Sequence, residues 1–88
     1  MQLTMPYPNP FNTELTIPYI IGKEGNHRVN IVVSDLAGRT VHRYAVTNGF
    51  GQYTHTWMPA AGLADGLYLV SFFVDDVLMQ TAKVVYKK

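Results

Sequence analysis

The sequence predicts an all-β fold, an antiparallel sandwich of about seven strands, on three observations. Apolar residues recur with a period of two, which is the spacing of side chains on one face of a strand. Clusters rich in Gly, Asn, Asp and Pro separate these runs at short intervals. No window carries the i, i+3, i+4, i+7 apolar stripe of a helix. Six of these strands are read from the apolar runs, and a short seventh is expected around Leu3 to Met5.

The first element is a stiff stretch, "PYPNPFN" (Pro6–Asn12), with prolines at alternate positions. Each proline fixes φ near about −65° and removes a backbone donor. It also pushes the preceding residue toward extended backbone. Such a stretch suits neither a helix nor a central strand. We therefore expect residues 1–12 to form a proline-rich lead-in and residues 13–88 to form the sandwich.

The next two runs are strands with one apolar face each. In "ELTIPYI" and "RVNIVVSD" the apolar residues fall on alternate positions. These residues are Leu15, Ile17, Tyr19 and Ile21, followed by Val29, Ile31 and Val33. Pro18 interrupts the first run and predicts an edge strand, because proline has no amide to donate to a ladder.

The remaining strands differ in polarity. "RTVHRYAV" is rich in polar residues, whereas "QYTHTW" alternates Tyr53, His55 and Trp57 against polar positions. "GLYLVSFFVD" is apolar on both faces, which favours a central strand. "VLMQTAKVVYK" closes the chain as the last strand.

Three connections are predicted from their turn residues. In "DLAGR", Asp35 accepts backbone amides at the first turn position, and Gly38 takes the positive φ of a short hairpin. Asp75 and Asp76 form a two-residue connection, because aspartate tolerates left-handed backbone better than most residues. Asn48–Gly49 is the third such site.

Length and composition exclude several classes. With 88 residues the chain forms one domain. The net charge is +1 and no basic cluster precedes Lys87 and Lys88, which argues against a nucleic-acid surface. There is no cysteine, so stability depends on the core. The apolar runs are far shorter than the ~20 residues that span a bilayer. No signal peptide precedes the fold, so we expect a segment excised from a larger secreted protein.

The histidines do not predict a metal site. His27, His42 and His55 are separated by 15 and 13 positions, with no close pairing and no cysteine to complete a set of ligands. A three-histidine site assembled in space stays open as an alternative. The interpretation that we favour places His27 in a loop, His42 on a strand surface and His55 beside Tyr53 and Trp57.

Nothing in the sequence predicts catalysis. The acidic residues are scattered except Asp75 and Asp76, and adjacent residues on a strand point to opposite faces rather than forming a catalytic pair. No serine lies in a nucleophile elbow, and no glycine loop precedes a helix. We therefore predict that the protein is not an enzyme and holds no cofactor.

Three aromatic residues admit two interpretations. Phe50, Tyr53 and Trp57 would suit a sugar-stacking platform, and a non-catalytic carbohydrate-binding module or a passive spacer is the alternative function. The interpretation that we favour places Tyr53 and Trp57 in the core and leaves Phe50 exposed between two glycines.

Taken in order, several motifs resemble one known family. "YPNPFNTELTIPY", "VNIVVSDLAGRTV" and "GLADGLYLVSFFVDDVLMQTAKVVYKK" are similar to the type A C-terminal sorting domain of the type IX (Por) secretion system. The resemblance extends from Tyr7 to Lys88. Two features depart from the family pattern: the connection at Asp75 lacks glycine, and "MPAAGLADGLY" is longer than many versions of that loop.

This resemblance implies an immunoglobulin-like sandwich that serves as a sorting signal. It implies that an upstream cargo domain crosses the periplasm and is directed by an outer-membrane shuttle and translocon to the cell surface. It also implies that a sortase-like cysteine protease removes the domain. Stiff prolines would then hold a joint clear of the sandwich, with a cleavage site at or before residues 2–6.

The resemblance assigns the sorting motif to four groups of residues. They are the opening motif (Tyr7, Pro8, Asn9, Pro10 and Phe11), the hairpin motif (Asp35, Gly38 and Arg39), the penultimate-strand motif (Gly66, Tyr68 and Val70) and the terminal motif (Lys83, Val84, Val85 and Lys87).

We expect the last strand, Val77 to Lys88, to present an open edge for recognition by strand addition or C-terminal capture. Its lysines are alternatively edge protection. An exposed terminal strand also allows a weak edge-paired or domain-swapped dimer.

Overall fold

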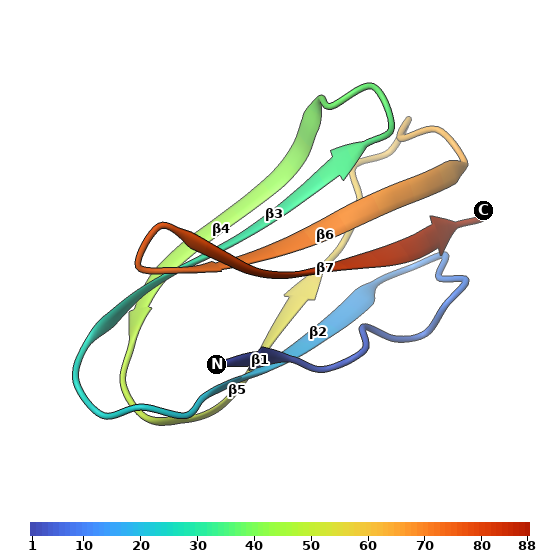
Figure 1. Ribbon diagram of the computed structural model, residues 1–88. Helices are drawn as coiled ribbons and strands as arrows, with labels where there is room; N and C mark the ends of the chain where they lie inside the picture. The colour runs from blue at the N-terminus through green and yellow to red at the C-terminus, as the bar shows by residue number, and fades with distance from the viewer.

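The structure is built of seven strands and contains no helix (Figure 1). It is a computed structural model that describes all 88 residues. The strands are β1 (Gln2–Leu3), β2 (Leu15–Ile21), β3 (His27–Asp35), β4 (Thr40–Asn48), β5 (Gly51–Trp57), β6 (Gly66–Val74) and β7 (Val77–Tyr86). The structure thus offers no helix long and apolar enough to cross a membrane. The predicted all-β fold is confirmed.

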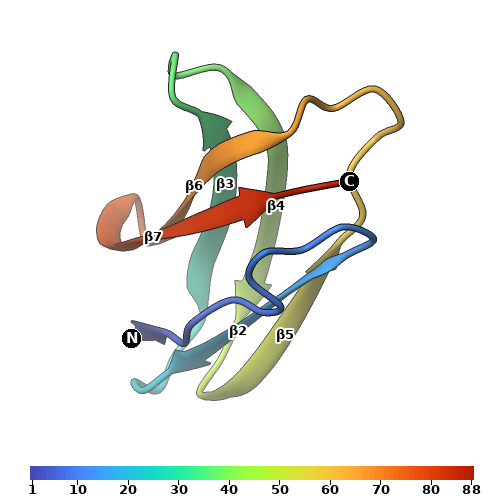
Figure 2. The ribbon, with the colours of Figure 1, turned by 90° about the vertical axis from the view of Figure 1, so that its right-hand side faces the viewer.

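The strands form two antiparallel sheets that pack face to face (Figure 2). One sheet has the order β1-β2-β5 and the other has the order β4-β3-β6-β7. Hairpins join β3 to β4 and β6 to β7, and the chain crosses between the sheets from β2 to β3, from β4 to β5 and from β5 to β6. The non-consecutive neighbours β3 and β6 complete the immunoglobulin-like sandwich.

One apolar core lies between the two sheets. Alternate residues of a strand point to opposite faces, so an apolar set with period two turns inward together. The predicted inward faces of β2, β3 and β6 are confirmed, because their alternate residues are buried. The core residues are Leu3, Phe11, Leu15, Ile17, Tyr19, Ile21, Val29, Ile31, Val33, Trp57, Tyr68, Val70, Phe72, Val74, Val84 and Tyr86. As predicted, β6 is a central strand, flanked by β3 and β7.

The prediction that Pro18 marks an edge strand is wrong, since β2 lies between β1 and β5. The Pro18 carbonyl accepts a hydrogen bond of 3.0 Å from the Thr4 amide. In an antiparallel strand the N–H and C=O of one residue point to the same side. The donor that Pro18 lacks would therefore face the side where the two-residue β1 has just ended, so the ladder to β5 remains intact.

The three predicted connections are present. The Asp35 turn closes the β3–β4 hairpin, with Gly38 at φ 88°. Asp75 and Asp76 form the two-residue connection of β6 and β7, at φ 51° and 66°. Asn48–Gly49 lies at the predicted connection between β4 and β5, which belong to different sheets. This connection is a corner between the two layers.

The connections gather at two ends of the sandwich (Figure 1). The C-terminal end holds the β3–β4 turn, the β5–β6 loop, the bend before β2 and the end of β7. The far end holds the β2–β3 loop, the β4–β5 corner and the β6–β7 turn.

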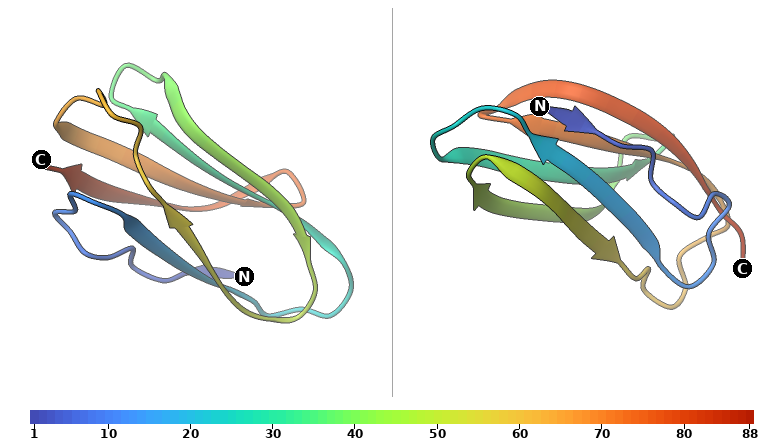
Figure 3. Two further views of the ribbon diagram at one scale, coloured as in Figure 1. Left: turned by 180° about the vertical axis from the view of Figure 1, so that it is seen from behind. Right: turned by 90° about the horizontal axis from the view of Figure 1, so that it is seen from below.

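The sandwich also has two long sides (Figure 3). On the lead-in side, residues 1–12 lie beside β7. On the β4–β5 side, the edge strands of the two sheets face each other.

Candidate functional site

The four motif groups meet at the C-terminal end and along the adjoining lead-in side (Figure 1). The opening and terminal motifs are in direct contact although more than 70 residues separate them. The hairpin and penultimate-strand motifs face each other, since Asp35 pairs with Tyr68 across β3 and β6. The structure therefore brings together residues that the sequence could only place in order.

Phe11 joins the lead-in to β7. Its amide donates to the Val85 carbonyl at 2.9 Å, and its carbonyl accepts from the Lys87 amide at 2.9 Å. These two bonds form an isolated parallel bridge with Tyr86. The Phe11 side chain is only 1% exposed and lies against the rings of Trp57 and Tyr86, with centroid distances of 5.6 and 5.1 Å. One residue thus supplies both edge pairing and core packing.

Asn9 extends this pairing with its side chain. Its Oδ1 accepts from the Val85 amide at 2.9 Å, and its Nδ2 donates to the Lys83 carbonyl at 3.3 Å. The carboxamide thus takes the place of a backbone peptide on the open edge of β7. We call the contacts of Asn9 and Phe11 with Lys83, Val85 and Lys87 the clasp.

Tyr7 anchors the other end of the opening motif to the first sheet. Its amide donates to the Thr16 carbonyl at 2.9 Å, and its carbonyl accepts from the Thr16 amide at 2.7 Å. Pro8 and Pro10, whose preceding peptide bonds are cis, carry the chain from β2 to β7. The opening motif therefore spans the gap between the two sheets.

Two expectations about this region need correction. The lead-in does not stand clear of the sandwich, because burial of the Phe11 ring and the edge hydrogen bonds hold it in place. The edge of β7 is also not open along its whole length, because the clasp occupies it from Lys83 to Lys87. The exposed large apolar residues of β7 are Val77–Met79 at its start and Val85 within the clasp.

The hairpin motif is a self-contained turn. Asp35 Oδ1 accepts from the Ala37 and Arg39 amides, at 3.0 and 2.9 Å, while its Oδ2 accepts from Arg39 Nε at 2.9 Å. The bond from the Arg39 amide is the main cause that holds the pKa of Asp35 below its ordinary value. The carboxylate of Asp35 and the amide and guanidinium of Arg39 therefore bind each other within the turn.

The penultimate-strand motif holds the start of β6. Tyr68 Oη donates to the Ala64 carbonyl at 2.5 Å, which is the tyrosine corner of immunoglobulin-like sandwiches. Burial raises the pKa of this phenol. Gly66 begins the strand at φ 155°, a backbone conformation that side chains rarely adopt. Val70 of this motif and Val84 of the terminal motif are core residues.

Four of the fifteen motif residues are buried and hold the fold, whereas nine are exposed. The buried four are Phe11, Tyr68, Val70 and Val84. The exposed charged groups near the clasp are Lys83, Lys87 and Lys88. The amide of Lys88 donates to Asp65 Oδ1 at 3.1 Å, so the end of β7 is tied to the β5–β6 loop. The C-terminal end thus presents lysine side chains on a fixed backbone.

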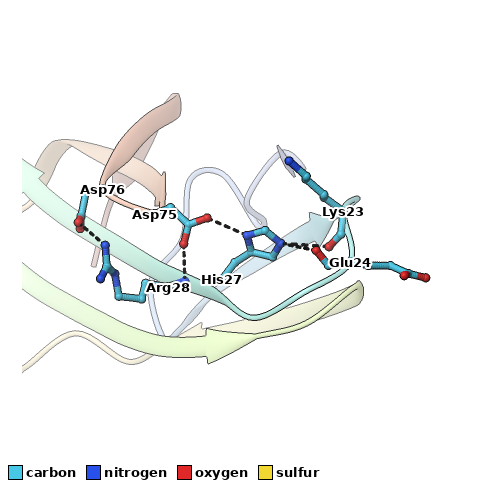
Figure 4. Close-up of polar contacts among 6 residues, drawn as sticks. All are labelled: Lys23, Glu24, His27, Arg28, Asp75 and Asp76. Atoms are coloured by element: carbon cyan, nitrogen blue, oxygen red, sulfur yellow. Dashed lines mark hydrogen bonds and ion pairs between the residues drawn. The ribbon is translucent and has the colours of Figure 1, made fainter.

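The far end contains a polar cluster that the sequence did not predict (Figure 4). His27 was expected in a loop, but it is the first residue of β3 and is 8% exposed. Its Nδ1 lies 2.7 Å from Asp75 Oδ2, and its Nε2 lies 3.2 and 3.1 Å from the carbonyls of Lys23 and Glu24. All these partners are acceptors, so both ring nitrogens donate. The hydrogen bond to Asp75 is the main cause that raises the pKa of His27.

Arg28 completes this cluster from the neighbouring position. Its amide donates to Asp75 Oδ1 at 2.9 Å, and its Nη2 donates to Asp76 Oδ2 at 2.6 Å. The two aspartates therefore tie the β6–β7 turn to β3, and each already has a partner within the fold. The carboxylates of Asp75 and Asp76 thus bind residues of β3 rather than each other.

The other two histidines meet on the β4–β5 side. His42 Nε2 lies 2.8 Å from His55 Nε2. His42 stacks on Trp57 at 5.5 Å and His55 stacks on Tyr44 at 3.8 Å. His42 lies half-buried on β4, and the aromatic neighbours of His55 are Tyr44 and His42 rather than Tyr53. The three histidines do not converge, and no group of three or more His, Cys, Asp or Glu could hold a metal ion.

The aromatic residues do not form one platform. Trp57 is 4% exposed, so it has no free face for a sugar ring. Tyr53 stacks on Tyr19 at 5.5 Å. Phe50 is 67% exposed, which confirms that prediction.

Comparison with known proteins gives one match. A family model described as the secretion system C-terminal sorting domain matches residues 6–87. This range includes the clasp and all four motif groups. The comparisons with curated proteins and with solved structures found no match.

Proposed function

The chain belongs to the family of secretion system C-terminal sorting domains, and we propose that it directs a fused cargo protein through the type IX outer-membrane translocon to the cell surface. The observation that carries this proposal is the family match over residues 6–87. The clasp supports it, because it joins the opening and terminal motifs in one folded unit. The role is that of a non-catalytic signal.

We propose that the partners are an outer-membrane shuttle, the translocon, a sortase-like cysteine protease and an upstream cargo domain. The surface that we assign to recognition is the C-terminal end with its exposed side chains of Lys83, Lys87 and Lys88. A receptor that binds these lysine side chains can contact the domain without breaking the hydrogen bonds of the clasp. The same lysines also discourage unwanted edge pairing.

Recognition by strand addition is the other mode that we considered. It is limited by the short length of unpaired edge on β7. The clasp occupies the backbone edge of β7 from Lys83 to Lys87, so a partner strand there would have to displace the lead-in. The remaining edge is Val77–Thr81, where Gln80 also exchanges two hydrogen bonds with the backbone of Leu3. A weak edge-paired dimer would use this same short stretch.

We propose that cleavage occurs on the N-terminal side of Gln2. A protease needs an extended and unpaired segment, whereas Leu3 is buried and pairs with Tyr19 of β2. Pro6 is also fully buried. Cleavage between these residues would require the lead-in to leave the sandwich.

A reporter protein fused to this chain tests the proposal in a host with a type IX system. We expect the fusion to reach the cell surface, whereas the reporter without this domain should not reach it. Deleting Val84–Lys88 would abolish delivery, but it also removes the core residues Val84 and Tyr86. A sharper variant replaces Lys83, Lys87 and Lys88 with serine, because this leaves the core intact.

The matched control for the triple variant is Lys23→Ser, which changes an exposed lysine at the far end. We expect the triple variant to stay folded and lose delivery, and the control to keep delivery. Full delivery by a reporter without the domain would favour a passive spacer. Binding of the isolated domain to a glycan array, with no effect on delivery, would favour a carbohydrate-binding module.

A further inference from the structure

Two histidines form a contact across the β4–β5 side of the sandwich, and neither belongs to the four motif groups. His42 lies on β4, the edge of one sheet, and His55 lies on β5, the edge of the other. Their Nε2 atoms are 2.8 Å apart, and this is the only hydrogen bond that the structure gives to either ring. The contact therefore connects two edge strands that belong to different sheets and do not pair with each other.

The two imidazole rings meet end to end. Their planes are within 7° of parallel and their centroids are 5.1 Å apart, which is the separation of two coplanar rings joined through their Nε2 atoms. The N–H of one ring therefore points along the lone pair of the other, as a good hydrogen bond requires. One Nε2 donates and the other accepts, so the contact holds a single hydrogen.

The two Nδ1 atoms determine how many protons the pair can gain without losing its contact. Both residues are half-buried, and no buried side-chain nitrogen in the structure lacks a hydrogen-bond partner, so the Nδ1 atoms are in contact with solvent. The donor ring can gain a proton at Nδ1 and still donate through Nε2. The acceptor ring already carries its hydrogen on Nδ1, so its next proton has to bind Nε2, inside the contact. One added proton thus preserves the hydrogen bond, and a second proton breaks it.

No opposite charge near the pair would compensate two protonated rings. Trp57 of β5 stacks on one ring and Tyr44 of β4 stacks on the other. The neighbouring strands β3 and β2 place Val33 and Ile17 opposite them. Tyr44 is the only titratable group among these neighbours, and no carboxylate acts on either ring. Two positive charges in this contact would therefore repel each other at short range.

The pair is neutral at neutral pH and gains charge in acid. Burial lowers the pKa of His42 and of His55 below the ordinary value of about 6.5, and the charge of His42 lowers that of His55 further. The two rings titrate as a coupled pair, so the second proton binds at a lower pH than the first. The stability that the contact contributes is complete above about pH 6.5 and is lost as pH falls through the pKa values of the folded chain.

We propose that the contact between His42 and His55 is an acid-sensitive closure, which holds the β4–β5 side together until both rings are protonated and then lets it open. The opening is local, because β4 stays paired with β3 and β5 stays paired with β2. Trp57, which stacks on His42 and is 4% exposed, becomes accessible to water. The clasp contains no histidine and stays closed. This inference concerns the fold and does not depend on the proposed sorting role.

Fluorescence of Trp57, the single tryptophan of the chain, tests the closure as the pH is lowered from about 7.5 to about 4. We expect the emission to shift to the red and acrylamide to quench it more strongly as the second proton binds. His42→Gln and His55→Gln should each abolish the red shift, because the glutamine carbonyl accepts from the remaining ring and gains no proton. His27→Gln is the matched control, because it changes the third histidine and leaves the pair intact, so it should keep the red shift.

Emission of the parent chain that does not change with pH, or an equal red shift in all three variants, would overturn the proposal. Nuclear magnetic resonance of the parent chain keeps the test valid if a variant fails to fold. The ring signals of His42 and His55 should titrate in two linked steps at lower pH than those of His27, while the Val85 amide of the clasp keeps its signal. Independent titration of the two rings at the ordinary pKa, or loss of the Val85 signal together with the red shift, would also contradict a local opening.

Discussion

On the lead-in side of the sandwich a stretch of backbone joins the two sheets, whereas on the β4–β5 side only side chains do so. Tyr7 pairs with β2 and Phe11 pairs with β7, so the opening motif bridges the gap with hydrogen bonds at both ends. Across the molecule, one contact between His42 and His55 and the rings stacked on it connect β4 to β5. A fold without disulfides thus closes its two sides by different means.

This difference shows where a chain of this size gains rigidity. Prolines restrict the unfolded lead-in, so fixing it against β7 costs less conformational entropy than fixing an ordinary loop. Prolines also lack an N–H, and the carboxamide of Asn9 supplies a donor and an acceptor to the β7 edge instead. The β4–β5 side has no such segment, and its closing contact depends on the protonation of two rings. We therefore expect the lead-in side to open less readily than the β4–β5 side when pH or denaturant concentration changes.

The largest effect is expected from Phe11→Ala, which removes the buried ring of the clasp. Loss of a buried phenylalanine typically costs about 3–5 kcal/mol of unfolding free energy. Urea unfolding measures this loss. Phe50→Ala is the matched control, because its ring is 67% exposed and the change should stay within about 0.5 kcal/mol. Equal effects of the two substitutions would show that the lead-in does not pack as described.

A smaller effect is expected from Asn9→Ala, which breaks the two side-chain bonds to β7 and leaves Phe11 in place. The site is exposed and water can replace these bonds, so the cost should be about 1 kcal/mol. The sharper measurement is hydrogen exchange of the Val85 amide, which should become faster. Asn12→Ala, whose side chain bonds only to Thr13, should leave that amide protected. Unaltered exchange in Asn9→Ala would contradict the clasp.

The effect of pH near neutrality should come from the far end rather than from the clasp, because the clasp side chains that pair there, Asn9 and Phe11, do not titrate. His27 faces Asp75 of the β6–β7 turn and the carbonyls of Lys23 and Glu24, with Arg28 beside Asp75. Its pKa in the folded chain lies above the unfolded value of about 6.5. Its contribution to stability is therefore complete below about pH 6.5 and is lost as pH rises through the folded pKa.

Urea unfolding of the parent chain and of His27→Gln from pH 6 to pH 9 isolates this contribution. The difference in unfolding free energy between the two should shrink as pH rises, and the Asn9→Ala difference should stay constant. A His27→Gln difference that grew with pH would reverse the assigned charge of His27.

The sequence predicted what depends on local pattern. The period of two identified the strands and the inward faces of β2, β3 and β6, because alternation is a property of neighbouring residues. The turns at Asp35 and at Asp75–Asp76 were also predicted, since backbone conformation there depends on residue type. The family was predicted from the order of the motifs, and the match over residues 6–87 confirms it.

Contacts between distant residues could not be predicted in the same way. Nothing near Phe11 in sequence indicates that its ring reaches Tyr86, and the prolines around it suggested a free joint. His42 lies in a strand with polar residues on both faces, so alternation could not decide its direction. An asparagine between two prolines is a usable signal in retrospect, because it carries the donor that its neighbours lack. The functional role of the motif residues stays a prediction.

The parallel bridge between Phe11 and Tyr86 has a consequence for the newly made protein. The ribosome adds Phe11 long before Tyr86, so the ring of Phe11 has to wait for β7 before it can be covered. If translation stops before β7, the Phe11 ring lacks its contact with Tyr86 and the domain is incomplete. The domain can therefore complete its core only after its last strand has been synthesised.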